Sequence, residues 1–498
     1  MSTIVIGRGI SFELPNGREL FKDLNFSLDG RLSALVGPNG VGKSCLAKLI
    51  AGQLEPSTGT IRRARSVRLL PQRQEPEPIT VTEFLCVDHQ WSLFGERLLA
   101  NIDPHAPCTV LSGGQWMRVR LACALAEDFL ILDEPTNDLD RDGREAVMQF
   151  LRERNGGALL ISHDRECLQL SEEIFELSNL GLARFGGGWA AYTEAKQRER
   201  ERARAALELA KRERDSAVTE RVEARVRQEK RNRRGARSAA DGGMPKILAG
   251  ARKRRAQATG GKLDSAALER SQSAVREAHA AFTKLKMEPL MYADLIGREI
   301  PAQKLVAEAH GFNVRFQEWI YRDDLDFAWH GNVRIALKGA NGSGKSTLLK
   351  AMLGAEFQTR GELRRGDLAA LYLDQRCSLL DDRKSVFENI RTVSSASDSE
   401  IRNGLAKFLF AKETVFQRVS DLSGGERLRA ALARGLLSAQ QPELLVLDEP
   451  TNNLDLINVE FLEQLVGAFR AALIVISHDE QFLKNCRISQ ELTVAGRT

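Results

Sequence analysis

The sequence lacks any uninterrupted apolar run of 18 or more residues, which is the minimum for a membrane-spanning helix. Its first residues, MSTIVIGRGISFELPNG, also lack the basic-then-apolar order of a secretory signal. Only seven cysteines occur in 498 residues, spaced singly and without a CxxC pair, which argues against a disulfide framework. We therefore expect a cytoplasmic protein in a reducing compartment, with no membrane partner.

One arrangement of cysteine and histidine has the spacing of a zinc site. Cys86 and His89 are followed by His105 and Cys108, a CxxH…HxxC order. We interpret this order as a chance occurrence in a surface segment.

The net charge of +5 is unevenly distributed along the chain. Residues 196–262 contain 22 Lys and Arg against 9 Asp and Glu, so the rest of the sequence is net acidic. Such asymmetry predicts a basic segment with its own role between two acidic domains.

Two halves of the sequence carry the same short phrases in the same order. LILDEPTNDLD at 130–140 returns as LVLDEPTNNLD at 445–455, and each copy has a GxxxxGKS loop before it and an SHD after it. Glu134 precedes His163 by the same 29 positions that separate Glu449 from His478. The chain is therefore an internal duplication.

The loops GPNGVGKS and GANGSGKS predict two phosphate-binding P-loops. Each follows an apolar stretch that reads as a strand and precedes one that reads as a helix, which is the context that a P-loop requires. Lys43 and Lys345 would reach the outer phosphates, and Ser44 and Ser346 would bind Mg²⁺. The nucleotide-binding residues expected here are Gly37, Pro38, Asn39, Gly40, Gly42, Lys43, Ser44 and Cys45, and Gly339, Asn341, Gly342, Gly344, Lys345, Ser346 and Thr347.

The repeated acidic phrase predicts the catalytic end of a buried strand. DFLILDE and ELLVLDE are apolar runs that end in two carboxylates. Asp133 and Asp448 would hold Mg²⁺, while Glu134 and Glu449 would polarise the attacking water. We assign His163 and His478, each at the end of another apolar run, to contacts with the γ-phosphate.

A third element, LSGGQ in the first copy and LSGGE in the second, places a serine and two glycines directly before a helix. This is an anion-binding geometry. The residues assigned to it are Ser112, Gly113, Gly114 and Gln115, and Ser423, Gly424, Gly425 and Glu426.

The order of these motifs resembles that of the ATP-binding cassette ATPases. The motifs PTNDLD and PTNNLD resemble that of the ABC-F family, which usually places His where Asp138 and Asn453 stand. The resemblance covers nearly the whole chain apart from its middle. It implies an ATPase that uses ATP and Mg²⁺. Each nucleotide would be bound between the P-loop of one cassette and the LSGGQ or LSGGE signature of the other. It also implies that Gln72 and Gln375 contact nucleotide and Mg²⁺, and that Asp140 and Asp455 connect the two sites.

Two positions depart from the pattern that the resemblance implies. Cys45 stands where a Thr is usual, which removes one hydroxyl contact. In the first copy, Leu14 stands near the place of the aromatic residue that would stack on adenine, with Phe12 two residues away, and the second copy offers Phe316.

Between the cassettes, the composition predicts a basic helical hairpin. Residues 193–234 contain neither Pro nor Gly and favour a long helix, glycines from 235 onward would break it, and a second helix is expected at 263–287. The fold class is therefore α/β, with a first cassette at 1–193, a linker at 194–295 and a second cassette at 296–498. The tip should contact nucleic acid through phosphates, with Arg231, Arg233, Arg234, Arg252, Lys253, Arg254 and Arg255 as its contact residues.

The family resemblance implies an ATP-gated translation factor whose linker reaches the ribosome, its rRNA and the tRNA sites. Both cassettes lie in one chain, so no obligate oligomer is expected. A DNA-binding or repair ATPase remains open, because charge alone does not distinguish rRNA from DNA, and so does the motor subunit of a transporter. The residues also leave open whether the protein protects ribosomes from an antibiotic or serves ordinary translation.

Overall fold

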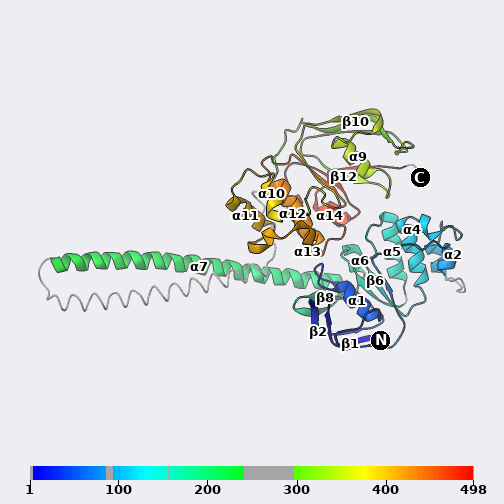
Figure 1. Ribbon diagram of the computed structural model, residues 1–498, viewed down its shortest axis with the longest axis horizontal. Coiled ribbons are helices and arrows are strands. Elements are labelled where there is room, and N and C mark those ends of the chain that lie inside the picture. The colour runs from blue at the N-terminus through cyan, green and yellow to red at the C-terminus, as the bar shows by residue number, and fades with distance from the viewer. Residues whose placement is uncertain (1–3, 86–92, 155, 241–296, 497–498) are drawn as a thin grey trace. The chain divides into compact units, whose positions relative to one another are not determined.

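The computed structural model describes residues 4–85, 93–154, 156–240 and 297–496. The chain divides into two compact units, one formed by residues 1–192 together with 289–498 and the other by residues 193–288 (Figure 1). Each unit is treated by itself. The first unit contains both halves of the duplication.

The first half is built on a six-stranded sheet with the order β5-β6-β7-β3-β8-β9. All neighbours in it are parallel except β8 and β9. Every residue of β6 and β7 is buried, as expected for central parallel strands. The strands are β3 (Leu32–Val36), β5 (Val67–Leu70), β6 (Phe129–Asp133), β7 (Gly157–Ile161), β8 (Glu173–Ser178) and β9 (Gly181–Gly186).

The second half repeats this plan with a five-stranded parallel sheet, ordered β14-β15-β16-β12-β17. Parallel strands end at the same edge of a sheet, so the P-loop, the acidic pair and the SHD segment of each half are brought together there. These strands are β12 (Arg334–Lys338), β14 (Ala370–Leu373), β15 (Leu444–Asp448), β16 (Ala472–Ile476) and β17 (Gln490–Thr493).

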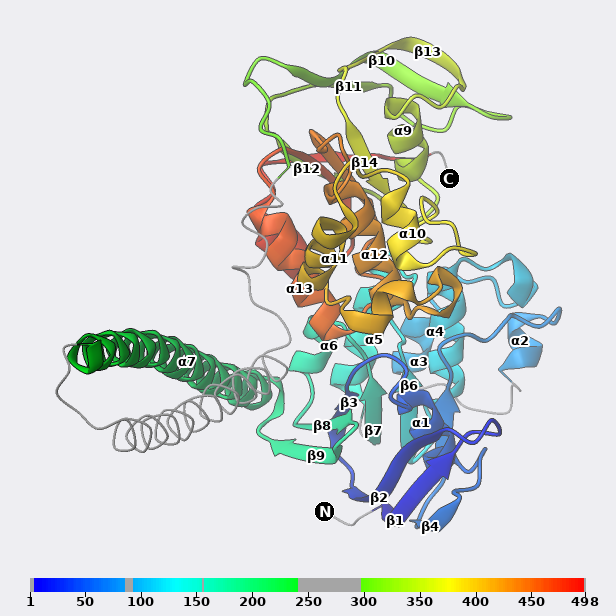
Figure 2. The same ribbon diagram turned by 60° about the vertical axis from the view of Figure 1, so that its left-hand side comes forward.

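Each half also carries a three-stranded antiparallel sheet, ordered β2-β1-β4 in the first and β11-β10-β13 in the second (Figure 2). Their strands are β1 (Val5–Glu13), β2 (Glu19–Leu28), β4 (Thr58–Arg63), β10 (Leu305–Arg315), β11 (Leu325–His330) and β13 (Gln358–Arg365).

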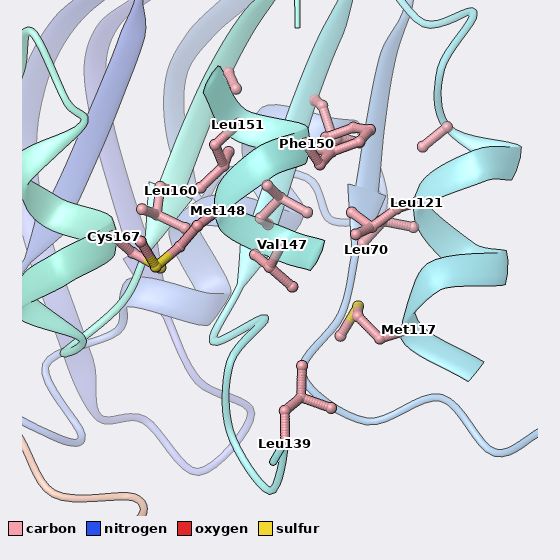
Figure 3. Close-up of a cluster of buried hydrophobic side chains, with 14 of the residues drawn as sticks. Leu70, Met117, Leu121, Leu139, Val147, Met148, Phe150, Leu151, Leu160 and Cys167 are labelled. Atoms are coloured by element: carbon pink, nitrogen blue, oxygen red, sulfur yellow. The ribbon is translucent and has the colours of Figure 1, made fainter. Parts of the chain in front are cut away.

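Helices pack on the parallel sheets through buried apolar side chains. In α5, the buried residues Val147, Met148, Phe150 and Leu151 recur at helical spacing and meet side chains such as Leu70 of β5 (Figure 3). The helices of the first half are α1 (Lys43–Ala51), α2 (Val81–Phe84), α3 (Leu93–Leu98), α4 (Gly113–Cys123), α5 (Arg141–Glu153) and α6 (Arg165–Gln169). Those of the second are α9 (Lys345–Met352), α10 (Val386–Arg391), α11 (Asp398–Lys407), α12 (Gly424–Leu436), α13 (Leu456–Ala468) and α14 (Glu480–Asn485). Short 3₁₀ turns are η1 (Cys108–Val110), η3 (Lys412–Phe416) and η4 (Val419–Asp421).

The helix expected after the first half is α7 (Gly188–Ala240), 53 residues long. It continues through Gly235, where we expected a break, because a single glycine costs a helix only about 1 kcal/mol. The return helix predicted at 263–287 lies outside the described residues, as do Arg252, Lys253, Arg254 and Arg255.

In the part of the chain that the structure describes, every helix is too short or too polar to cross a membrane. The same residues contain no group of three or more His, Cys, Asp and Glu arranged to hold a metal ion, while Cys86 and His89 lie outside them.

Candidate nucleotide-binding sites

Both P-loops have the strand–loop–helix context that the sequence predicted. The first joins β3 to α1 and the second joins β12 to α9. The residue before each helix, Gly42 or Gly344, has a φ of 106° or 92°, a conformation that L side chains rarely adopt. The glycines are therefore required by the backbone of the loop itself.

The two P-loop lysines are buried and point into their own loops. Lys43 Nζ donates to the carbonyls of Gly37 at 2.7 Å and Pro38 at 3.1 Å. Lys345 Nζ donates to the carbonyl of Gly339 at 2.8 Å, and the side chains are enclosed to a similar degree. Burial lowers the pKa of Lys43, which nearby carboxylates oppose. A bound anion would relieve this desolvation, so both loops fit a phosphate ligand.

The acidic pairs occupy the predicted strand ends. Asp133 and Asp448 are the last residues of β6 and β15, and both are buried. Glu134 and Glu449 follow with φ values of 49° and 47°, rare for residues other than glycine. Such backbone strain concentrates at functional sites.

Each acidic pair faces the histidine of its own half. His163 Nε2 lies 3.3 Å from Glu134 Oε1, and His478 Nε2 lies 3.3 Å from Glu449 Oε1. The two contacts do not have hydrogen-bond geometry, and among the described residues neither imidazole Nε2 has a hydrogen-bond partner. Buried polar atoms without partners are unusual, so both imidazoles fit a ligand that supplies one.

Burial shifts the charge state of these groups. It raises the pKa of Glu134 to about 8 and that of Glu449 to about 7, while the P-loop lysine opposes the rise in each half. It lowers the pKa of His478 to about 4 and that of His163 well below its ordinary value. The glutamates are therefore easily protonated, and added positive charge nearby would return them to carboxylates.

The predicted signature segments begin helices. Ser112 caps α4 and Ser423 caps α12, each in a capping box with the residue three positions later. The second glycine of each segment packs on the helix that follows the repeated acidic phrase. A Cβ at Gly425 would lie 2.0 Å from Asn458 Nδ2, whereas one at Gly114 would lie 3.4 Å from the Cα of Gly143.

Several hydrogen bonds join the two halves at the first P-loop. Asn39 N donates to Asp455 Oδ2 at 3.0 Å, and Asn39 Nδ2 donates to the carbonyl of Asn453 at 2.8 Å. The amide of Gln72 donates to Asn453 Oδ1 at 3.0 Å. We call this P-loop with its surroundings the first site, and the matching region around Lys345 the second site.

The second site is a cavity of about 750 Å³. Its lining includes Lys345, Glu449 and His478 from the second half and Asp138 and Leu139 from the first. Asn341 Nδ2 also donates across to the carbonyl of Asp138 at 2.9 Å. Ser112, Gly113, Gly114 and Gln115 do not line this cavity, so their assignment to it stays a prediction.

Tyr372 is a site residue that the sequence analysis missed. Its hydroxyl donates to Asp448 Oδ2 at 3.2 Å, and it lies on β14, which pairs with β15. The sequence did contain a signal for it, since Tyr372 stands three residues before Gln375, whereas the first half has Leu69 at the matching position.

The aromatic residues considered for adenine each pack against another aromatic ring. Phe316 is 64% exposed and packs edge-on against Phe357, while Phe12 stacks on Phe21.

The polar groups at the strand ends fit Mg²⁺ through few protein ligands. Burial raises the pKa of Asp133, and the hydroxyl of Ser44 opposes that rise, so two oxygen-bearing side chains interact beside the P-loop. Magnesium in nucleotide sites commonly takes one or two protein oxygens, with phosphate and water completing its shell. Ser44 with Asp133, and Ser346 with Asp448, match that need.

Comparisons with known proteins agree with this arrangement. The family model described as "ABC transporter" matches residues 21–137 and 323–452. The chain is 32% identical to the ATP-binding protein Uup of Caulobacter vibrioides, over 94% of this chain and 73% of that protein. It is 28% identical to the ribosome protection protein VmlR of Bacillus subtilis, over 97% and 85%. It is also 28% identical to the ABC transporter F family member 5 of Arabidopsis thaliana, over 94% and 72%.

Among solved structures, the archaeal ribosome recycling factor aABCE1, in complex with the stalk protein aP1, has a TM-score of 0.58 at 18% identity. The match covers 98% of this chain and 89% of that one, and it concerns the fold.

Proposed function

The chain belongs to the ABC-F family of tandem ATP-binding cassette proteins and is an ATPase, and on this premise we propose that it is a ribosome-associated translation factor in which ATP closes the two cassettes on each other. The observation that carries the proposal is the set of hydrogen bonds from the first P-loop to the second cassette, led by Asn39 N to Asp455 Oδ2 at 3.0 Å. A loop that binds phosphate is thereby tied directly to the opposite cassette.

In this proposal, the residues of each P-loop bind the phosphates of ATP, and the glutamates act on water. Glu134 and Glu449 accept a proton from the attacking water, which requires them as carboxylates. Lys43 and Lys345 favour that form electrostatically. His163 and His478 supply imidazole nitrogens to the terminal phosphate. Mg²⁺, held by Ser44 and Asp133 or by Ser346 and Asp448, would neutralise phosphate charge when bound.

Replacement of both glutamates tests these roles. We expect Glu134→Gln with Glu449→Gln to retain ATP binding and to lose multiple-turnover hydrolysis, because glutamine cannot accept the proton. Turnover that persists in the double variant would refute the assignment of both residues.

The ribosomal part of the proposal is supported by α7 and by the similarity to a protein named for ribosome protection. Near its start, acidic and basic side chains of α7 pair, as Glu194 does with Arg198 at 2.6 Å. Residues 230–240 contain five Lys and Arg and no acidic residue, and Arg233 and Arg234 are exposed. A charge cluster of one sign attracts phosphate backbones.

ATP-dependent co-sedimentation with ribosomes tests this part. The Glu134→Gln, Glu449→Gln protein would be pelleted with ribosomes, with and without ATP, across a salt series. We expect ATP-dependent pelleting, because the double variant holds the closed form. Absence of ATP-dependent pelleting, together with tight binding to naked DNA, would assign the protein to DNA instead.

Paired substitutions on α7 separate a binding surface from general charge. In the same background, we expect Arg233→Ala with Arg234→Ala to weaken pelleting and to reduce the salt slope by roughly one unit per lost phosphate contact. Arg198→Ala with Arg227→Ala removes two charges from the same helix where each pairs with a glutamate, and should have little effect. Equal effects of the two pairs would contradict a localised contact surface.

Whether the protein protects ribosomes from an antibiotic is a narrower proposal with its own test. Translation by purified ribosomes in the presence of ribosome-targeting antibiotics would be measured with and without the protein. Rescue with one class of antibiotic would assign a protective role, and no rescue with any would assign ordinary translation.

A further inference from the structure

An ion pair between the two cassettes has no counterpart at the matching position. Arg165 on α6 makes two contacts to the Glu463 carboxylate on α13, at 2.7 and 3.1 Å. The side chains are 14% and 10% exposed. Paired planar contacts of this kind are the strong form of an arginine–carboxylate interaction.

The duplication identifies the residues that would make the matching pair. Counted from the SHD motif, Glu480 occupies the place of Arg165, and counted from the repeated acidic phrase, Met148 occupies the place of Glu463. Glu480 instead contacts Lys338 of its own cassette at 3.2 Å, and Met148 is buried in the first core. The two halves of the interface are thus chemically different.

The cluster around the pair repeats this one-sidedness. Arg144 of the first cassette pairs with Asp164 at 2.6 Å, and Asp164 also caps α6, which orients Arg165. Val459 stands at the place of Arg144 in the second cassette. Burial raises the pKa of Asp479, the counterpart of Asp164, and the charges of Arg144 and Arg165 oppose that rise across the interface.

Helix α13 is anchored to the first cassette at two points. Its capping residue Asp455 accepts from Asn39 N in the first P-loop, and Glu463 contacts Arg165 eight residues later, a distance of roughly 12 Å along the helix. Arg165 follows His163 of the first site by two positions. The Asp455 anchor therefore lies at the first site itself, whereas Arg165 is close in sequence to the histidine of that site and also acts electrostatically on Asp479.

At the second site the cassettes are connected differently, and Arg144 of α5 acts electrostatically on Glu449 and His478. Among the residues that the structure describes, the direct hydrogen bond there runs from Asn341 Nδ2 to the backbone carbonyl of Asp138. We propose that Arg165 and Glu463 form a one-sided latch, which holds α13 against the first cassette and stabilises closure of the first ATP site more than that of the second. Arg165 is a positioning residue, since it acts through α13. The proposal rests on the site assignment above and is independent of the ribosome.

Equilibrium binding of a fluorescent ATP analogue tests the latch in the Glu134→Gln, Glu449→Gln protein. Adding Lys345→Ala leaves the first site able to bind, and adding Lys43→Ala leaves the second. With the first site intact, we expect Arg165→Gln to raise the analogue concentration at half saturation about tenfold, the scale of a lost charge-assisted contact. With the second site intact, we expect less than about a twofold change.

Two further variants distinguish a latch from general destabilisation. Arg152→Gln breaks a pair on α5 that is 48% and 64% exposed, and should leave binding unchanged. Glu463→Gln should reproduce Arg165→Gln, and the double variant should be no worse than either, because the two residues act as one pair. The latch is refuted if Arg165→Gln behaves like Arg152→Gln, if the two losses add, or if both sites weaken equally. If the protein with Arg165 and Glu463 intact binds no analogue at either site, the assignment of the nucleotide sites is refuted instead.

Discussion

The two signature glycines predict opposite responses to the same substitution. Both lie in helical conformation at the start of a helix, where alanine is favoured over glycine by about 0.5–1 kcal/mol. At Gly114, the added methyl group would meet Gly143 at ordinary van der Waals distance. We therefore expect Gly114→Ala to leave stability unchanged or slightly raised.

At Gly425, the methyl group would collide with the side chain of Asn458, 2.0 Å from Nδ2 and 2.4 Å from Cγ. That side chain cannot move freely, because it donates to Asp455 Oδ1 at 2.6 Å and accepts from Arg429. Overpacking costs about 1–3 kcal/mol, and a lost buried hydrogen bond about 1–3 kcal/mol more. After subtraction of the roughly 0.5–1 kcal/mol by which alanine favours the helix, we expect a net loss of about 1–5 kcal/mol.

Thermal unfolding measures this difference. For a cassette of this size, each kcal/mol corresponds to about 2–4 °C, so Gly425→Ala should lower the unfolding midpoint of the second cassette by roughly 2–20 °C. Asn458→Gly, which copies the first cassette, should make the same methyl group harmless when Gly425→Ala is added to it. Equal midpoints for Gly114→Ala and Gly425→Ala, or an unchanged cost in the Asn458→Gly background, would refute the reasoning.

The Glu134 carboxyl and the Tyr372 hydroxyl can each be tested by a single substitution. Burial raises the pKa of Glu134 to about 8, so the folded protein holds a proton that the unfolded chain releases, and this contribution to stability is lost as pH rises from about 4.5 to 8. Between about pH 6.5 and 8.5, the free energy of unfolding of Glu134→Gln, measured with a chelator present, should therefore rise by about 2 kcal/mol relative to that of wild type. The control Glu145→Gln, at an exposed position, should show no such rise. A difference between Glu134→Gln and wild type that does not change with pH would contradict this reasoning. Tyr372→Phe removes a hydrogen bond to Asp448, so it should change the Mg²⁺ concentration needed for nucleotide binding at the second site. This is measured in the Lys43→Ala background, in which only the second site binds. An unchanged Mg²⁺ requirement would show that Tyr372 does not position that carboxylate.

Local features of both cassettes could be predicted because neighbouring residues determine them. The glycines of the P-loop are dictated by backbone conformation within the loop, and the buried strands by continuous apolar runs such as FLILD and LLVLD. The capping boxes at Ser112 and Ser423 likewise involve residues three positions apart. For helix α7, composition predicted the helix, but the predicted break at Gly235 was wrong, because the cost of one glycine is small within a long helix.

The sequence by itself determined that the chain has two cassettes with the same motifs, since those motifs depend on short-range order. Only the tertiary structure decided how the copies differ. The pairing of Arg165 with Glu463 joins residues 298 positions apart, and the contact of Tyr372 with Asp448 joins neighbouring strands. No local pattern encodes either contact, because each depends on which surfaces the folded sheets and helices bring together, and the same motif order is compatible with a symmetric or a one-sided interface.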